Sequence, residues 1–282
     1  MDTTVKKSLN PRKTFWKCGA CSHAMFHLLN HEFDNSKSRE EKASDMLAGG
    51  IAQKGHQCGM LWGGALAAGT ESFRRYDDKN VAIATAIHTS KLLVESFKKR
   101  TRSANCRDIA KVNWESKFEL ALYTIKSLAR GMVFNPCFNL MVKWTPEAVQ
   151  AANQGLSENK KFTRPCLSCS TELVKKMGGT EEESVMVAGF AGGLGLSGHA
   201  CGALSAAIWY KMLNWEKNNE GKSQQMFNNP DAKKVLEAFY EQTNSEVLCK
   251  NITQTSFNTI DEHTEYIRNG GCRNLIEGLA TS

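Results

Sequence analysis

The chain has 282 residues, of which 41% are hydrophobic and 23% are charged, a composition that excludes an intrinsically disordered protein. Its formal net charge of +7 is uneven: residues 1–154 hold 23 Lys and Arg against 14 Asp and Glu, whereas residues 155–282 hold 13 against 15. We therefore expect an acidic partner protein to dock on the basic first half. We expect no nucleic acid, since no recognition motif accompanies the positive charge.

Neither the N-terminus nor the longest uncharged stretch predicts membrane targeting. The first residues contain no apolar run before a cleavage site, so we expect no signal peptide. Residues 184–210 carry no charge, but they are rich in glycine, and the corresponding residues 41–67 are charged. This pattern indicates two buried helices broken by a glycine turn, and we expect a cytoplasmic protein without a membrane span.

Apolar residues at helical spacing predict one order of elements that occurs twice. In the first half we expect a helix from residue 21, a second over 38–48, a glycine turn, a third from 58, a long amphipathic helix ending at 97 and further helix around 106. In the second half we expect the matching helices from residue 169, over 180–191 and from 201. A long amphipathic helix should end at 239, with further helix around 249. Because β-branched alternation is nearly absent and proline is rare, the predicted fold class is all-α.

The positions of the cysteines show that the chain contains an internal repeat. They fall into two sets of five, at 18, 21, 58, 106 and 137 and at 166, 169, 201, 249 and 272. Cys58 and Cys106 recur 143 residues later, as does the Gly55-His56 pair. We expect two tandem, pseudo-symmetric helical repeats that pack together, over residues 14–154 and 162–282, with a polar linker at 155–165. A homo-oligomer is also compatible with the sequence.

Scattered cysteines that are retained in both repeats favour chemistry over simple packing. Four thiolates suit an iron–sulfur cluster or zinc. The spacing differs from that of a zinc ribbon, because only one pair in each repeat is close in sequence. A glycine-lined pocket between helices therefore favours iron–sulfur.

The glycines around the central cysteine would let the backbone approach the sulfur atoms. They are Gly55 and Gly59 in the first repeat and Gly198 and Gly202 in the second. His56 and His199 would either donate hydrogen bonds near the cluster or serve as polar residues at a helix start.

Two alternatives remain open at this stage. Cys18 and Cys21, like Cys166 and Cys169, form CxxC pairs that open a helix, and such pairs can act as metal-free redox dithiols because a helix N-terminus stabilises a thiolate. In the other alternative the cysteines are core residues or zinc ligands of a non-enzymatic protein. The sequence therefore leaves open whether the protein is an enzyme; if it is one, we expect an oxidoreductase.

Both halves resemble the C–GCAxxG–C–C family of redox-active proteins. The family's first cysteine is similar to Cys21 in CSHAM and to Cys169 in CSTEL, and its glycine-rich segment is similar to the one that ends in Cys201-Gly-Ala-Leu. The second half matches more closely, because the first reads Cys58-Gly-Met-Leu. The family is related to the split-Soret cytochromes, but Ser follows both CxxC motifs, so this chain lacks the haem-attachment motif.

The resemblance implies a helical redox unit and a ligand set for each half. In the first half the family cysteines are Cys21, Cys58, Cys106 and Cys137. In the second half they are Cys169, Cys201, Cys249 and Cys272. Cys18 and Cys166 are additions to the family pattern. We therefore expect each set of four to bind an iron–sulfur cluster for electron transfer.

Overall fold

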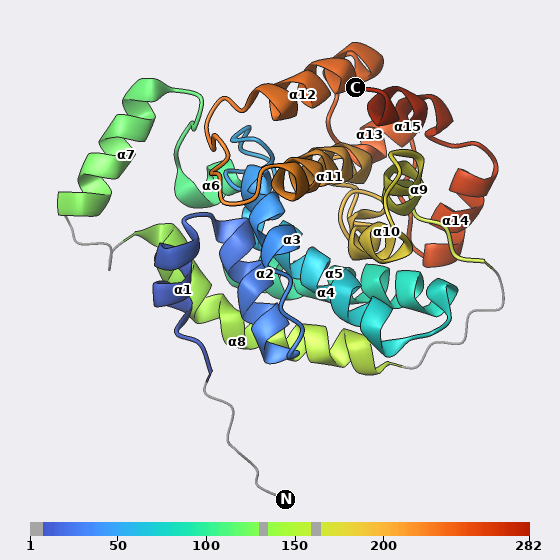
Figure 1. The fold of residues 1–282 in the computed structure, drawn as a ribbon, viewed down its shortest axis with the longest axis horizontal. Helices are drawn as coiled ribbons and strands as arrows, with labels where there is room; N and C mark the ends of the chain where they lie inside the picture. The colour runs from blue at the N-terminus through green and yellow to red at the C-terminus, as the bar shows by residue number, and fades with distance from the viewer. Residues whose placement is uncertain (1–7, 130–134, 159–164) are drawn as a thin grey trace, which may run out of the picture.

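The computed structural model describes residues 8–129, 135–158 and 165–282, and these form α-helices and short 3-10 helices without a β-strand (Figure 1). In chain order the α-helices are α1 (Pro11–Cys18), α2 (Cys21–Glu32), α3 (Ser38–Ala43), α4 (Gly59–Arg75), α5 (Lys79–Thr101), α6 (Cys106–Ala110), α7 (Lys117–Ala129), α8 (Pro136–Ser157), α9 (Cys169–Lys176), α10 (Glu181–Met186), α11 (Gly202–Asn218), α12 (Pro230–Thr243), α13 (Cys249–Thr253), α14 (Ile260–Arg268) and α15 (Arg273–Ala280). The all-α prediction is confirmed.

Most predicted helix starts agree with the structure, but several ends do not. The segments expected to be helical over 38–48 and 180–191 begin as α3 and α10 and then tighten into the 3-10 helices η1 (Ser44–Leu47) and η3 (Ala188–Phe190). The linker expected at 155–165 is partly wrong, because α8 continues through Ser157. Residues 159–164 of that linker lie outside the described part of the chain.

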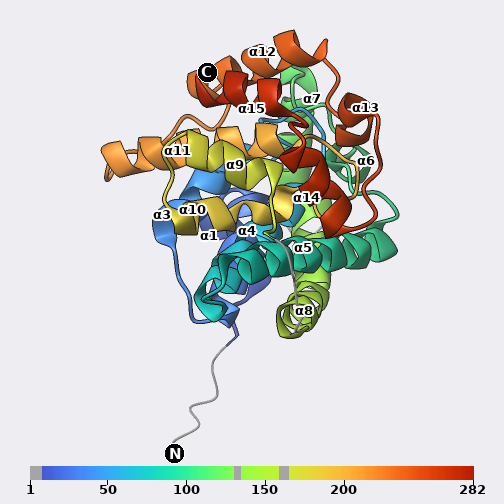
Figure 2. The same ribbon diagram turned by 90° about the vertical axis from the view of Figure 1, so that its right-hand side faces the viewer.

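Helices α4 and α11 form the centre of the molecule, with α8 at the bottom and α12 at the top in both views (Figures 1 and 2). Helix α4 packs against α2 and α5, and α5 packs against α8. Glycine lets α4 approach two neighbouring helices closely. A Cβ at Gly63 would lie 2.1 Å from the Ser22 carbonyl oxygen of α2, and one at Gly69 would lie 2.3 Å from the Met186 carbonyl oxygen of α10.

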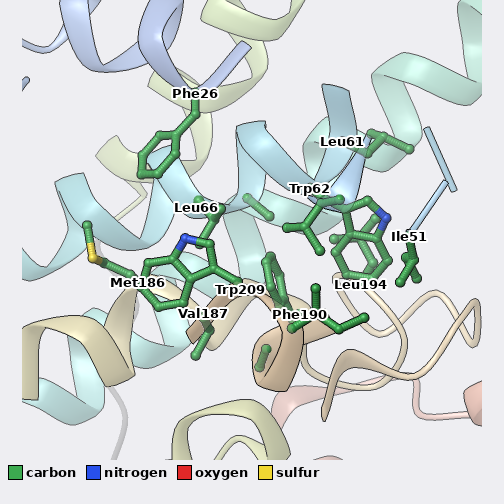
Figure 3. Close-up of a cluster of buried hydrophobic side chains, with 14 of the residues drawn as sticks. Phe26, Ile51, Leu61, Trp62, Leu66, Met186, Val187, Phe190, Leu194 and Trp209 are labelled. Carbon is green, nitrogen blue, oxygen red and sulfur yellow. The ribbon is translucent and has the colours of Figure 1, made fainter. Parts of the chain in front are cut away.

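The two halves of the chain share one hydrophobic core (Figure 3). The Trp62 ring meets the Phe190 ring edge-on, with 4.8 Å between centroids, and both side chains are fully buried. Contacts between the halves are reciprocal, because α4 packs on α10 while α11 packs on α3. Trp209 of α11 donates its indole N–H to the carbonyl oxygen of Glu40 at 3.1 Å. The core is thus built from both repeats, whereas the domain boundaries at 14–154 and 162–282 stay a prediction.

The glycine turns that precede Cys58 and Cys201 are left-handed coils. Residues 49–53 and 192–196 all have positive φ, including non-glycine residues such as Ile51 (62°) and Leu194 (70°). The same hydrogen bonds close both coils: Gly55 N to Gly49 O at 2.9 Å, and Gly198 N to Gly192 O at 2.9 Å. Since left-handed backbone costs an L-residue roughly 1–2 kcal/mol, the surrounding structure must hold these segments in place.

Candidate cysteine sites

The first cysteine site is built from four separate elements. Cys21 is the first residue of α2, Cys58 precedes α4, Cys106 opens α6 and Cys137 lies in the first turn of α8. These four cysteines line one cavity of about 290 Å³. Its walls are mainly apolar, and Phe15 and Phe138 stack beside it with 4.3 Å between ring centroids. The fold therefore brings together all four cysteines that the family resemblance assigned to the first half.

Cys21 is the thiol of this site that is most readily ionised. A hydrogen bond from Cys58 lowers the pKa of Cys21, burial opposes this, and the backbone N–H groups of Gly49, Cys21 and Ser22 add to the lowering. The same sulfur–sulfur hydrogen bond, together with burial, raises the pKa of Cys58. The start of α2 and the left-handed coil thus form a cradle of N–H donors for one negatively charged sulfur.

The backbone ties Cys58 to Cys106. Cys58 N donates to Ala104 O at 2.8 Å, and Cys106 N donates to His56 O at 2.6 Å. Burial raises the pKa of the Cys106 thiol, and the nearby Cys21 and Cys137 charges raise it further. Burial likewise raises the pKa of Cys137 to about 12. Both thiols are therefore protonated at neutral pH unless a positively charged group binds them.

The second cysteine set repeats these backbone contacts. Cys201 N donates to Val247 O at 2.8 Å, and Cys249 N donates to His199 O at 2.6 Å. The Gly192 N–H donates to Cys169, as Gly49 does to Cys21.

Charges on neighbouring thiols oppose the ionisation of Cys201, Cys249 and Cys272. Burial is the main cause that raises the pKa of Cys201 and of Cys249, and charges on neighbouring thiols add to it. The pKa of Cys272 is raised to about 12 by burial and by Cys169. Cys169, Cys201, Cys249 and Cys272 thus gather in the second half as their counterparts do in the first.

The structure gives the other two cysteines different neighbours. Cys18 hydrogen-bonds the His23 side chain, which in turn lies 3.1 Å from Asp45. Cys166 receives a long hydrogen bond of 3.8 Å from the Thr264 hydroxyl. Neither cysteine has its CxxC neighbour as the partner in these bonds. All ten cysteines fall within the described residues, and all are free thiols.

The predicted glycines fulfil several different tasks. A Cβ at Gly59 would lie 2.6 Å from the Cys21 sulfur, so this glycine makes room for the thiol itself. Gly202 instead makes room for backbone, since its Cβ would lie 2.0 Å from the Phe190 carbonyl oxygen. Gly55 and Gly198 have positive φ, and the Cβ positions there face Arg107 and Lys250.

The two histidines act mainly through their backbone. His56 is not among the residues that line the first cavity, and its N–H donates to Gly50 O at 3.1 Å. Burial and the nearby Arg107 and Lys54 charges lower its pKa. Burial, with Lys98 and Lys250, lowers the pKa of His199 to about 4, so this imidazole is neutral near pH 7.

Aromatic donors to the sulfur atoms were not predicted from the sequence. Trp114 Nε1 donates to Cys106 Sγ at 3.3 Å, and the Tyr123 hydroxyl shares its proton between Asn135 Oδ1 at 3.0 Å and Cys137 Sγ at 3.7 Å. Tyr266, which lies 143 residues after Tyr123, hydrogen-bonds Cys272. The repeat register, extended from cysteines to aromatic residues, would have identified the tyrosine pair.

The arrangement differs from that of a site for one metal ion. Across residues 8–129, 135–158 and 165–282, no three His, Cys, Asp or Glu side chains lie close enough together to hold a single ion. The first four thiols surround a cavity instead. Separately, none of the helices in these ranges combines the length and apolar character needed to cross a bilayer.

A helical fold that brings cysteines together in two sets is typical of cysteine-based redox proteins. The family model described as "Putative redox-active protein (C_GCAxxG_C_C)" matches residues 20–178 and again residues 164–281. The chain therefore belongs to this family, and the double match is consistent with a tandem duplication. No curated protein and no solved structure matches the chain.

Proposed function

We propose that each set of four cysteines binds an iron–sulfur cluster and that the protein transfers electrons. The observation that carries this proposal is the apolar cavity of about 290 Å³ lined by Cys21, Cys58, Cys106 and Cys137. A space of this size between thiols suits a group of several iron and sulfide ions better than one zinc ion, which needs its ligands about 2.3 Å away. Four thiolates in apolar surroundings are typical ligands of iron–sulfur clusters.

The protein would prepare the site mainly through hydrogen bonds to sulfur. The N–H groups around Cys21 favour its thiolate, while burial keeps Cys106 and Cys137 protonated. Binding would therefore release protons, and loading would weaken as the pH falls. An iron–sulfur cluster supplies one-electron transfer when bound. The surrounding Tyr123 and Trp114 donors would stabilise negative charge on the ligands.

Iron and sulfide analysis of anaerobically purified protein, with its absorption spectrum, tests this proposal. Cys58→Ser and Cys201→Ser should each remove about half of the bound iron, and the double variant should remove nearly all of it. Cys18→Ser is the matched control, because Cys18 bonds His23 rather than the cavity thiols, and it should leave the iron content unchanged. Colourless, iron-free wild-type protein would contradict the proposal.

A second candidate is metal-free thiol–disulfide chemistry. The hydrogen bond between Cys21 and Cys58 favours it, since a lowered pKa on one thiol beside a protonated second thiol is typical of a redox dithiol. It would give the protein an oxidoreductase activity that needs no metal. Mass spectrometry after mild oxidation distinguishes this pair from the CxxC pairs Cys18–Cys21 and Cys166–Cys169.

The partner of electron transfer would be an acidic protein. The first half carries 23 basic against 14 acidic residues, and it also holds the first cysteine cavity. Complementary charge would guide the encounter and make its rate fall with rising salt concentration. Stopped-flow reduction at several ionic strengths measures this dependence.

A further inference from the structure

The large apolar side chains that are exposed among the described residues lie on the segments around the first cavity. They are Trp16, Phe118, Leu122, Ile125, Val142 and Phe227. These side chains belong to α1, α7, α8 and the segment before α12, and each of the four segments also contributes residues that line the cavity. Exposed apolar surface is therefore concentrated beside the first cysteine site.

Three of these side chains form the apolar face of α7, which lies at the left edge of the molecule in Figure 1. Phe118, Leu122 and Ile125 follow the i, i+4, i+7 spacing of one helix face and are 75%, 37% and 62% exposed. Leu120 and Tyr123 of the same helix line the cavity. Helix α7 thus borders the cysteine site with some side chains and presents others to solvent.

The repeat shows that the fold does not need apolar residues at these three positions. Helix α14 begins 143 residues after α7, and the matching positions there are Asp261, Glu265 and Arg268. All three are exposed, as their counterparts in α7 are. Since a group of exposed apolar side chains is typical of a binding surface, binding explains the apolar face of α7 better than folding does.

The charge of the surrounding segments favours an acidic partner. Residues 11–18, 117–129, 136–146 and 224–229, here called the rim segments, hold six Lys and Arg against one Glu. The basic residues are Arg12, Lys13, Lys17, Lys117, Lys126 and Lys143. The acidic residue, Glu119, accepts a hydrogen bond from the Asn113 N–H at 2.7 Å. A second copy of this chain would bring the same positive charge to the contact, so charge opposes self-association through this face.

The acidic residues next to the rim segments are paired. Glu115 lies 2.6 Å from the Lys54 ammonium group, and Glu147 forms an ion pair with Arg100. These pairs reduce the repulsion that the two carboxylates would exert on an acidic partner.

We propose that the apolar face of α7 is the docking site of an acidic protein, whose apolar centre packs on Phe118, Leu122 and Ile125 and whose carboxylates meet the basic rim segments. An apolar centre within a polar rim is typical of protein–protein interfaces. A lipid surface fits less well, because helices that lie on membranes have a polar face rich in Lys and Arg, whereas α7 contains two Lys and one Glu. The inference rests on the proposed function and places the electron-transfer partner beside the first cavity.

Binding of two helical peptides to the full chain, measured by fluorescence anisotropy, tests the inference. Both peptides carry Leu on one face, and the opposite face carries Glu in the first peptide and Lys in the second. We expect the acidic peptide to bind about tenfold more tightly than the basic one, because like charges oppose the contact of the basic peptide. The affinity of the acidic peptide should fall as the salt concentration rises.

A triple variant of α7 tests the apolar contribution without a change in net charge. Phe118→Asn, Leu122→Gln and Ile125→Gln together should weaken binding of the acidic peptide about tenfold. Circular dichroism and iron content should remain those of the wild type, since α14 carries polar residues at the same positions.

A double variant of α1 tests the charge contribution. Lys13→Gln with Lys17→Gln should weaken binding of the acidic peptide and reduce its dependence on salt. Lys98→Gln with Lys99→Gln is the matched control, because it removes two exposed charges from α5, a fully described helix that contributes no residue to the cavity lining. The control should bind as the wild type does.

Several results would overturn the docking site. They are equal binding of the two peptides, no binding of the acidic peptide, and unchanged binding in the triple variant. A dimer that the triple variant dissociates would assign the face to a second copy, and binding to phosphatidylserine vesicles that the same variant abolishes would assign it to a membrane. In each case iron loading of the wild type would still support the proposed function. Iron-free protein that binds the acidic peptide through α7 would keep the docking site and overturn the proposed function.

Discussion

At Gly59, a single hydrogen atom in place of a side chain determines whether Cys21 fits its site. An added methyl group would lie 2.6 Å from Cys21 Sγ and 3.0 Å from Ala48 Cα. We expect Gly59→Ala to displace the thiol, to lower the free energy of unfolding by about 1–3 kcal/mol and to reduce iron loading of the first site. Chemical denaturation and iron analysis measure the two effects.

Gly64→Ala provides the comparison on the same helix. The new methyl group would lie 3.3 Å from a flexible end of Leu93 and would not touch a cysteine. This variant should keep its iron and nearly all of its stability. Equal iron contents in the Gly59 and Gly64 variants would argue against a role for Gly59 in placing the thiol.

His263 couples stability to pH. It is 1% exposed, and burial lowers its pKa to about 4, although a hydrogen bond with the Leu167 backbone opposes the shift. The unfolded chain, with its ordinary value of 6.5, therefore binds a proton first, and stability falls as the pH drops from 6.5 to 4. The contribution of this group is on the order of 3 kcal/mol.

The corresponding residue of the first half, Leu120, suggests the variant that tests this coupling. His263→Leu should flatten the dependence of the unfolding free energy on pH between 6.5 and 4. Part of the slope should remain, because burial also lowers the pKa of His199 to about 4. Denaturant titrations at several pH values measure this effect. The same dependence of the unfolding free energy on pH in the wild type and in His263→Leu would count against this account.

At the scale of the element, the left-handed coils have the strictest backbone requirements. A Cβ at Gly50 would lie 2.4 Å from His56 N, whereas Ala52 already adopts a φ of 46° with a methyl group. Gly50→Ala should therefore cost about 1–3 kcal/mol of stability. Ala52→Gly should be neutral or stabilising by up to about 1 kcal/mol, because it relieves left-handed strain. Thermal unfolding measures both effects. A lower melting temperature for Ala52→Gly than for Gly50→Ala would contradict this account of the coil.

The coils also show which features of the site a sequence can predict. Helical spacing and capping residues predicted the starts of α2, α3 and α10, because these features depend on neighbouring residues. The repeat and the family resemblance selected the cysteines that the structure gathers. A run of non-glycine residues with positive φ could not be predicted, since local preference opposes it and tertiary contacts impose it.

Trp114 was missed for a related reason. An aromatic residue in a helical protein is usually a core residue, and the sequence does not show which atom its N–H faces. Only the folded chain places that donor 3.3 Å from Cys106 Sγ. The tyrosines, in contrast, recur in register and were open to prediction.

At the scale of the whole molecule, the shared core makes the halves interdependent. Gln57 is 1% exposed, accepts from Ala200 N at 3.0 Å and donates to Asn105 Oδ1 at 2.9 Å. Gln57→Leu would leave the buried Ala200 N–H without its partner, which should cost about 1–3 kcal/mol. Since the core is common to both halves, unfolding should remain one transition with a lower midpoint.

Asn105→Ala is the useful comparison, because it removes one partner of Gln57 and keeps the bond to Ala200. Fluorescence and circular dichroism should give coincident unfolding curves for both variants. Separate transitions for the two probes would mean that the halves unfold independently.

Gln57 and Ala200 occupy the same position in the two repeats and are bonded to each other. In an assembly of two identical short subunits, this position would face its own copy, and two glutamines would compete for the same space. Fusion into one polypeptide removes that restriction, because each position can be encoded separately. The long polar side chain of Gln57 can then pair with the small residue Ala200, whereas two identical subunits would carry the same residue at this position.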